Sequence, residues 1–253
     1  MDYLLLVELG LIFALGTYVQ TATGFGLGMI IMGAVTIFGL LPIAFTSVVI
    51  SLMTLSNGVF AIKGNSKALN LKLVAYTCAG LVPGIALGLF ILNYMSAQMN
   101  NILQLLLGIA IMLGASTTLL KPEPSKQVSR NWSFALAGKL AGLLAGLFSV
   151  AGPPLVYQFY RQPLDLKTIR LCLILTFLIS SVIRTTMVGL QGGLELSMFS
   201  FALCTVPIVY IATWLGKNCP PPLSTLNMRR FAISLLLILG ASLIVKSILV
   251  MID

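Results

Sequence analysis

The sequence predicts an all-α polytopic membrane protein made of two inverted repeats, each a broken re-entrant helical hairpin followed by three transmembrane helices. Three observations lead to this prediction. First, 58% of the 253 residues are hydrophobic and only 8% are charged, and the mean hydropathy of +1.06 lies outside the range of soluble domains. Second, two apolar segments are each interrupted by small and polar residues. Third, the lysines and arginines gather in a few short connections.

The first broken segment covers residues 3–38, and its interruption reads Thr21-Ala-Thr-Gly-Phe-Gly-Leu-Gly-Met29. A membrane helix broken in this way leaves backbone N–H and C=O groups that lipid cannot satisfy, so the break must face protein, water or a ligand. Glycines at the break let a ligand approach the backbone, and neighbouring polar side chains can add hydrogen bonds. The candidate binding residues of this break are Gln20, Thr21, Thr23, Gly24, Phe25 and Gly26.

A similar interruption lies 128 residues later, in the segment 132–160, where it reads Ser149-Val-Ala-Gly-Pro-Pro154. Gly10 and Gly24 are 14 residues apart in the first half, as are Gly138 and Gly152 in the second. We interpret this spacing as an internal duplication. The candidate binding residues of the second break are Ser149, Gly152, Pro153, Pro154 and Gln158.

The remaining apolar segments are long enough to cross the membrane, since about 30 Å of hydrocarbon takes about 20 helical residues. The chain should therefore divide into a first transmembrane repeat over residues 1–120, a cytoplasmic linker over 121–131 and a second repeat over 132–253. The predicted crossings are 42–62, 72–92, 101–120, 168–190, 196–216 and 231–250.

The basic residues determine the predicted topology, because cytoplasmic loops are enriched in lysine and arginine. Twelve of the fifteen lie in or beside four connections, near residues 63–72, 121–130, 161–170 and 217–230. If every segment crossed once, half of these twelve would be external. If the broken segment 132–160 enters and leaves on one side, all twelve are cytoplasmic. The two halves are then inverted, and a first hairpin that also folds back leaves both termini external.

Each break predicts a site for a small anion, because the exposed N–H groups and the positive end of a helix dipole favour negative charge. The alternative is that the small residues only allow close helix packing. Arg184 is a candidate for binding the substrate, although it lies close enough to a helix end to reach the interface, as do Lys139 and Lys246. Asn57 is a candidate site-lining residue or an interhelical hydrogen-bonding group.

The acidic residues argue against cation transport, because none lies near the centre of a predicted crossing, where a cation carrier normally needs a carboxylate. They are Asp2, Glu8, Glu123, Asp165, Glu195 and Asp253. The chain has no histidine, which excludes Ser-His-Asp triads and histidine metal sites, and it has no phosphate-binding loop of the Walker type. The four cysteines form no C-x-x-C pair. We therefore predict neither an enzyme nor a cofactor or metal site.

Several of these motifs resemble the TauE/SafE family of membrane permeases, also known as the sulfite exporter family. The resemblance rests on Thr23-Gly-Phe-Gly-Leu-Gly28, the mid-chain linker, and Gly142-x-x-x-Gly146-Leu-Phe-Ser-Val-Ala-Gly-Pro-Pro154 followed by Tyr160 and Asp165. It covers nearly the whole chain. Gly-Pro-Pro stands where family members often carry further glycines. The resemblance implies transport of small sulfur-containing anions such as sulfite or an organosulfonate.

Together, these observations predict a multi-pass permease of the cell membrane that exports a small anion, held at the midplane between two broken helices. Its partners are the anionic substrate and the lipid bilayer, and not nucleic acid, because the basic residues are dispersed among loops. The sequence leaves open whether the chain forms a homo-oligomer. The alternatives are an anion channel and a membrane scaffold subunit without transport activity.

Overall fold

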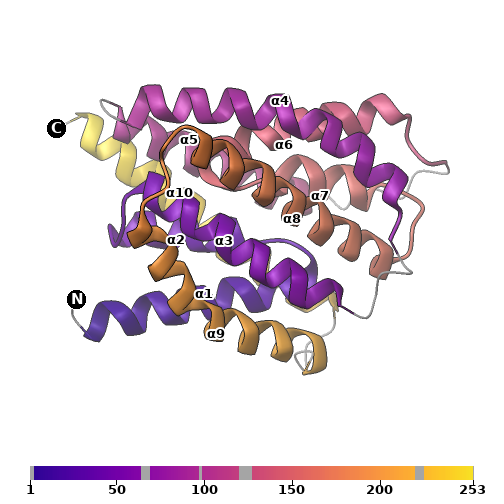
Figure 1. Cartoon of the computed structure of the whole chain (residues 1–253), viewed down its shortest axis with the longest axis horizontal. Helices are drawn as coiled ribbons and strands as arrows, with labels where there is room; N and C mark the ends of the chain where they lie inside the picture. The colour runs from indigo at the N-terminus through magenta and orange to yellow at the C-terminus, as the bar shows by residue number, and fades with distance from the viewer. Residues whose placement is uncertain (1–2, 64–68, 97–98, 120–126, 220–224, 253) are drawn as a thin grey trace.

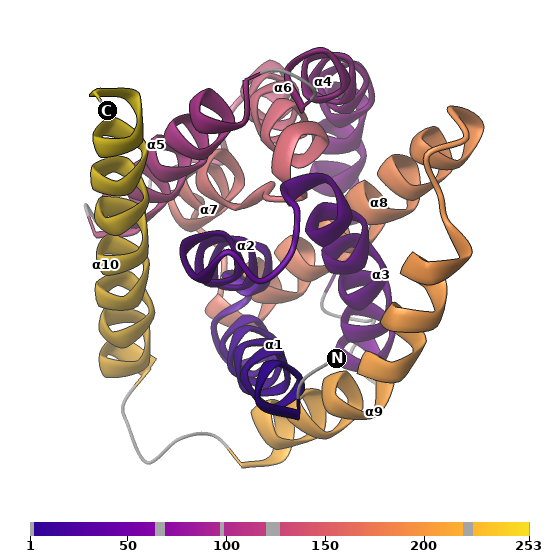
Figure 2. The same ribbon diagram turned by 90° about the vertical axis from the view of Figure 1, so that its left-hand side faces the viewer.

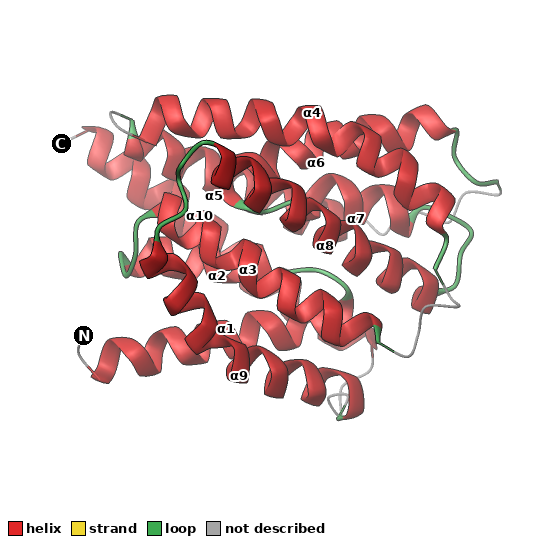
Figure 3. Ribbon diagram, viewed as in Figure 1, coloured by secondary structure: helices red, strands yellow, loops and turns green. Residues whose placement is uncertain are grey.

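The computed structural model describes residues 3–63, 69–96, 99–119, 127–219 and 225–252, and within these ranges the chain is helical without strands (Figure 3). The predicted linker falls largely outside the described residues, since 120–126 are not among them, and neither are Lys67, Lys121 and Lys126. Among the described residues, six helices are long and apolar enough to cross a membrane.

The ten helices of the described ranges form one bundle (Figure 1). In the first half they are α1 (Tyr3–Thr23), α2 (Leu27–Phe38), α3 (Ile43–Ile62), α4 (Leu71–Ser96) and α5 (Asn100–Leu119). In the second half they are α6 (Asn131–Phe148), α7 (Gly152–Tyr160), α8 (Leu166–Leu190), α9 (Leu196–Asn218) and α10 (Thr225–Ile252). Each predicted apolar segment thus forms a helix or, for the two broken segments, a pair of helices. The main difference in boundaries is that α10 begins six residues before the predicted start at 231.

Both interruptions depend on residues in the left-handed region of backbone conformation. Gly24 has a φ of 89° and Gly26 a φ of 112°, values that glycine adopts without a steric cost. At the second break, Ser149 takes a φ of 58° and its N–H donates to Ala145 O at 2.8 Å, so it ends α6 as a left-handed cap. The broken segments are not pairs of equal half-helices. α1 and α6 have 21 and 18 residues, whereas α2 and α7 have 12 and 9.

Hydrogen bonds between helix ends show which connections share one end of the bundle. Lys217 Nζ at the end of α9 donates to Phe60 O near the end of α3 at 3.0 Å. The N–H of Ser129, just before α6, donates to Gln162 Oε1, just after α7, at 2.9 Å. α4 and α8 also begin at this end, where Asn70 N lies 3.3 Å from Cys172 Sγ. We call it the basic end, because the described parts of all four basic connections lie there.

The opposite end of the bundle carries the other connections. Asn93 Nδ2 at the end of α4 donates to Gln191 Oε1 at the end of α8, at 3.0 Å. Lys246 Nζ, near the end of α10, donates to Ile37 O at the end of α2 at 2.8 Å. The first and last described residues lie at this end too, marked N and C in Figure 1. Each broken segment therefore returns to the end of the bundle from which it starts.

The packing of the first half is repeated in the second. α6 packs along α4 as α1 packs along α9, α2 contacts α10 as α7 contacts α5, and α3 and α8 contact each other. α2 lies at the centre of the bundle when it is viewed end-on (Figure 2), and residues 27–36 of this helix are all buried. The short second helix of the first broken segment is therefore held inside the bundle, as a buried site requires.

The contact between α4 and α6 is unusually close, because glycines of both helices face each other. A Cβ atom added at Gly84 would collide with Lys139 O, and one added at Gly142 would lie 3.0 Å from the Cα of Gly84. Small residues spaced by four let membrane helices approach to backbone contact. The facing residues are Gly80, Gly84 and Gly88 of α4 with Gly138, Gly142 and Gly146 of α6.

Candidate functional site

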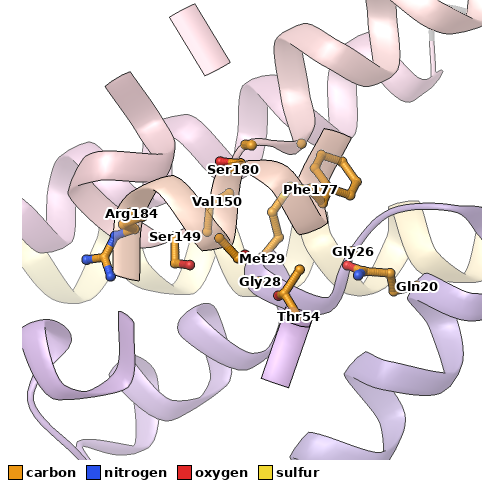
Figure 4. Close-up of a pocket in the computed structure, with 13 residues that line it drawn as sticks. Gln20, Gly26, Gly28, Met29, Thr54, Ser149, Val150, Phe177, Ser180 and Arg184 are labelled. Atoms are coloured by element: carbon orange, nitrogen blue, oxygen red, sulfur yellow. The ribbon is translucent and has the colours of Figure 1, made fainter. Parts of the chain in front are cut away.

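The two interruptions meet at a buried cavity between α1, α2, α3, α7 and α8 (Figure 4). Its volume of about 30 Å³ is room for about two water molecules. The polar side chains of the lining come from α1, α3 and α8 and from Ser149 at the second break, and the apolar lining includes Met29, Val150 and Phe177. The lining residues are Gln20, Gly26, Gly28, Met29, Thr54, Ser149, Val150, Ala151, Gly152, Phe177, Ser180, Ser181 and Arg184.

The two breaks touch each other directly at this cavity, and glycines allow the contact. A Cβ atom added at Gly28 would lie 2.7 Å from Ser149 O, and one at Gly152 would lie 2.8 Å from the Cε of Met29. Both distances are shorter than ordinary van der Waals contact. Side chains at these two positions would push the start of α2 away from the second break.

The first break offers backbone donors to the cavity. Among the described residues, the N–H groups of Gly28 and Met29 have no hydrogen-bond partner, and both residues line the cavity. They belong to the first turn of α2, where the helix dipole is positive. The N–H of Leu27 is already used, because Gln20 Oε1 accepts it at 3.2 Å. An anion in the cavity would therefore meet two free amides of α2.

The second break also offers backbone donors, because among the described residues the N–H groups of Ala151 and Gly152 have no hydrogen-bond partner and both residues line the cavity. α7 begins at Gly152 and continues with Pro153 and Pro154, and proline has no backbone N–H. Pro153 and Pro154 therefore add no amide to those of Ala151 and Gly152. The second break also supplies the hydroxyl of Ser149, which lies 2.8 Å from Ser51 Oγ.

Arg184 of α8 provides a positive charge beside the second break. Its side chain is only 1% exposed and lines the cavity. The guanidinium bridges α3 and α6: it donates to Ser47 Oγ at 2.7 Å, to Ser47 O and Ser51 Oγ at 3.2 Å, and to Gly146 O at 3.3 and 3.4 Å. Four of these five contacts are at or beyond the long end of the usual range for N–H···O bonds. A ligand that offers shorter bonds can compete for these donors.

No carboxylate balances this charge within the described part of the chain. The acidic residues described there are Glu8, Asp165 and Glu195, and none of them contacts Arg184. An unpaired charge in a buried site is costly, so buried charges are normally paired. The site thus carries one positive charge, free amides at both breaks and several hydroxyls, which is the chemistry that binds an anion.

Asn57 of α3 holds together the helices on the other side of the first break. It is fully buried, and its amide accepts from Gln20 Nε2 at 3.0 Å and donates to Thr21 Oγ1 at 2.8 Å and to Thr213 Oγ1 at 2.9 Å. All these groups are satisfied by protein, and Asn57 does not line the cavity. Its geometry fits the alternative of hydrogen bonding between helices, and it fixes the position of Gln20, which does line the cavity.

The structure brings together only some of the candidate residues. Those that line the cavity are Gln20, Gly26, Ser149, Gly152 and Arg184. Those that do not line it are Thr21, Thr23, Gly24, Phe25, Asn57, Pro153, Pro154 and Gln158. Phe25, for example, lies fully buried in the apolar core, and Thr23 Oγ1 donates to Val19 O at 2.8 Å within its own helix.

The sequence did not single out the apolar lining, because Val150 and Phe177 have the same character as the rest of the membrane helices. Met29 and Gly28 belong to the interrupted stretch itself. Thr54, Ser180 and Ser181 were visible as polar residues near Asn57 and Arg184. Nothing in the sequence showed that they share one cavity.

Comparison with known proteins gives matches over nearly the whole chain. A sequence model of the family described as "Sulfite exporter TauE/SafE" matches residues 9–243. The "Probable sulfite/organosulfonate exporter TauE" of Cupriavidus necator is 43% identical over 97% of this chain and 96% of its own length. The "Probable inner membrane transporter protein TsaS" of Comamonas testosteroni is 26% identical over 69% of this chain and 74% of its own. No solved structure matches significantly.

Proposed function

Because the chain belongs to the sulfite exporter TauE/SafE family of membrane transporters, we propose that it is a secondary transporter that exports sulfite or an organosulfonate. The substrate binds in the cavity where the two breaks meet. Its negatively charged oxygens accept from Arg184 and from the free amides of Gly28 and Met29, and the hydroxyls of Ser149, Ser180 and Ser181 can complete the shell.

The buried guanidinium of Arg184 is the observation that carries this proposal. A cation with only neutral partners in a membrane bundle gains most from an anionic ligand, since the ligand supplies the missing counter-charge. The long contacts to Gly146 O and Ser51 Oγ are the ones that a sulfonate can replace, because its oxygens accept the same donors with charge assistance.

The orientation of the chain and the direction of transport are further parts of the proposal. The basic end is cytoplasmic by the positive-inside rule, the two halves are inverted repeats, and both termini are external. With the cytoplasm negative, moving one negative charge outward releases about 2.3 kcal/mol per 100 mV. Export therefore needs no membrane-embedded carboxylate to couple a proton.

The test is flux and binding with the purified protein in proteoliposomes. Sulfite and sulfoacetate should bind and be transported with saturable rates, and an imposed potential should change the net flux of the anion. Sulfate and chloride serve as competitors that report on specificity. A protein that moves none of these sulfur anions, or whose flux is linear in concentration as in an open pore, would refute the proposal.

The variant Arg184→Gln should weaken sulfite binding by roughly 10- to 100-fold, since a hydrogen bond to a charged group contributes about 1.5–3 kcal/mol. Lys139→Gln is the matched control, because it removes the same charge from an exposed position of α6. The control should bind sulfite like the unaltered protein. Equal effects of both substitutions would mean that Arg184 acts only through the overall charge of the bundle.

A further inference from the structure

A second arginine of α8, Arg170, closes the basic end of the bundle over the first break. Its Nη1 donates to Ala22 O at 3.1 Å, and the hydroxyl of Tyr160 donates to the next carbonyl, Thr23 O, at 3.0 Å. These two carbonyls form the C-terminus of α1, where the helix dipole favours a cation. Two side chains from the second half of the chain therefore hold the end of α1.

The backbone of α8 also lies directly against the first break at this point. A Cβ atom added at Gly24 would be 2.8 Å from the Cγ of Arg170 and 3.1 Å from its Cα. The start of α8 thus covers the turn that joins α1 to α2. Opening the basic end toward the cavity requires these contacts to separate.

Arg170 has donors to spare for a ligand. Its side chain is half-buried, and the bond to Ala22 O is its one hydrogen bond to another described residue. A guanidinium has five N–H donors. None of the described carboxylates pairs with it, so its charge, like that of Arg184, is balanced by neutral oxygens alone.

The two arginines lie along one helix, on opposite sides of the first break. Arg170 precedes Arg184 by 14 residues of α8, which corresponds to a rise of about 21 Å and to nearly four full turns. They consequently project from about the same face of α8. Arg170 contacts Ala22 O near the C-terminus of α1, and Arg184 contacts Gly146 O near the C-terminus of α6.

We infer that Arg170 is a second anion-binding residue at the basic end, and that the substrate enters by taking the place of the Ala22 carbonyl on its guanidinium. This inference rests on the proposed function and adds a step to it. When the anion binds, the end of α1 loses one of the two hydrogen bonds that join its last carbonyls to α7 and α8. The anion then passes the break at Gly24 to the cavity beside Arg184.

The test compares transport from the two faces of the membrane. Everted vesicles present the basic end to added sulfite, and right-side-out vesicles present the opposite end. With Arg170→Gln, the KM for sulfite at the basic end should rise about tenfold or more, because a charge-assisted hydrogen bond is lost. The KM at the opposite end should stay unchanged. The equilibrium of sulfite across the membrane fixes the ratio of Vmax/KM in the two directions. With the maximal rate from the basic end unchanged, the maximal rate from the opposite end should therefore fall by the same factor.

Two further variants separate binding from packing. Arg170→Lys keeps the charge but not the planar fork, so it should give a smaller KM increase, again at the basic end alone. Tyr160→Phe removes the contact to Thr23 O without changing any charge, and it should leave KM at both ends within about twofold of the original value, since it removes no ligand of the anion.

Two results would overturn the inference while leaving the proposed function intact. One is an equal change of KM at both ends, and the other is an unchanged KM at the basic end in both Arg170→Gln and Arg170→Lys. A greater KM effect of Tyr160→Phe than of Arg170→Gln would also overturn it, because the contact would then matter only as packing. Absence of sulfite transport by the unaltered protein would instead refute the proposed function.

Discussion

The glycine contact between α4 and α6 should be the most sensitive packing feature of the bundle. Gly84→Ala adds one methyl group at the centre of this contact. The new Cβ would collide with Lys139 O and lie 2.9 Å from the Cα of Gly142 and 3.0 Å from the N of Leu143. All three neighbours are backbone atoms. The collision cannot be relieved by rotating a side chain, so the two helices must move apart.

The loss in free energy of unfolding that this contact causes can be isolated by comparison with a matched substitution. Overpacking a tightly packed position typically costs about 1–3 kcal/mol. Gly10→Ala is the control, because the added Cβ would lie 3.7 Å from Ile208 Cδ1, an ordinary contact. Both substitutions replace glycine with alanine inside a helix, so the change in intrinsic helix propensity of up to about 1 kcal/mol is common to both. The difference between the two variants, about 1–3 kcal/mol, therefore isolates the contact.

The free energy of unfolding should be measured for both variants in the same detergent micelles, by titration with a denaturing detergent and by thermal unfolding. We expect Gly84→Ala to unfold at a lower denaturant fraction and Gly10→Ala to unfold no earlier than the unaltered protein. If the two variants are equally stable, then α4 and α6 do not meet at backbone distance, and the packing argument is refuted.

Three other substitutions test the site and its surroundings. Gly28→Ala should lower sulfite transport and cost about 1–3 kcal/mol of stability, as measured by flux and unfolding, because its Cβ would lie 2.7 Å from Ser149 O. Asn57→Leu should lower both stability and sulfite affinity, since three buried partners lose their bonds at about 1–3 kcal/mol per unsatisfied group. The side chain and N–H of Thr168 hold the pKa of Asp165 below its usual value. The stability that the Asp165 carboxylate contributes is therefore present above its unfolded pKa of about 3.9 and is lost as the pH falls through the lower folded value. Asp165→Asn keeps the helix cap but cannot titrate, so in acid unfolding curves the variant should lose less stability as the pH falls.

The positions of the membrane helices could be predicted from the sequence, because hydropathy and loop charge report on the membrane directly. The crossing predicted at 42–62, for example, is α3, and that at 168–190 is α8. The lengths of the broken helices could not be predicted. Glycine marks where a helix is interrupted, but the lengths of α1 and α2 depend on packing against α9 and α10, which no local pattern records.

The candidate site could be predicted only in part, for a similar reason. Gln20, Ser149 and Arg184 could be identified as polar groups in apolar surroundings, and all three line the cavity. Thr21 and Asn57 have the same character in the sequence but point into a hydrogen-bonded contact between helices. Which polar residue of a membrane helix faces a cavity and which faces another helix is decided by helix rotation, and the rotation of each helix is fixed by its neighbours.

The position of the positive charge has a consequence for how an anion is held. The guanidinium of Arg184 lies beside Gly146 in the second half of the chain, whereas the free amides of Gly28 and Met29 belong to α2 in the first half. An anion bound by both must bridge the two halves at the point where Gly28 meets Ser149 O. Any motion that separates the halves then breaks one set of bonds, which couples release of the anion to opening of the bundle.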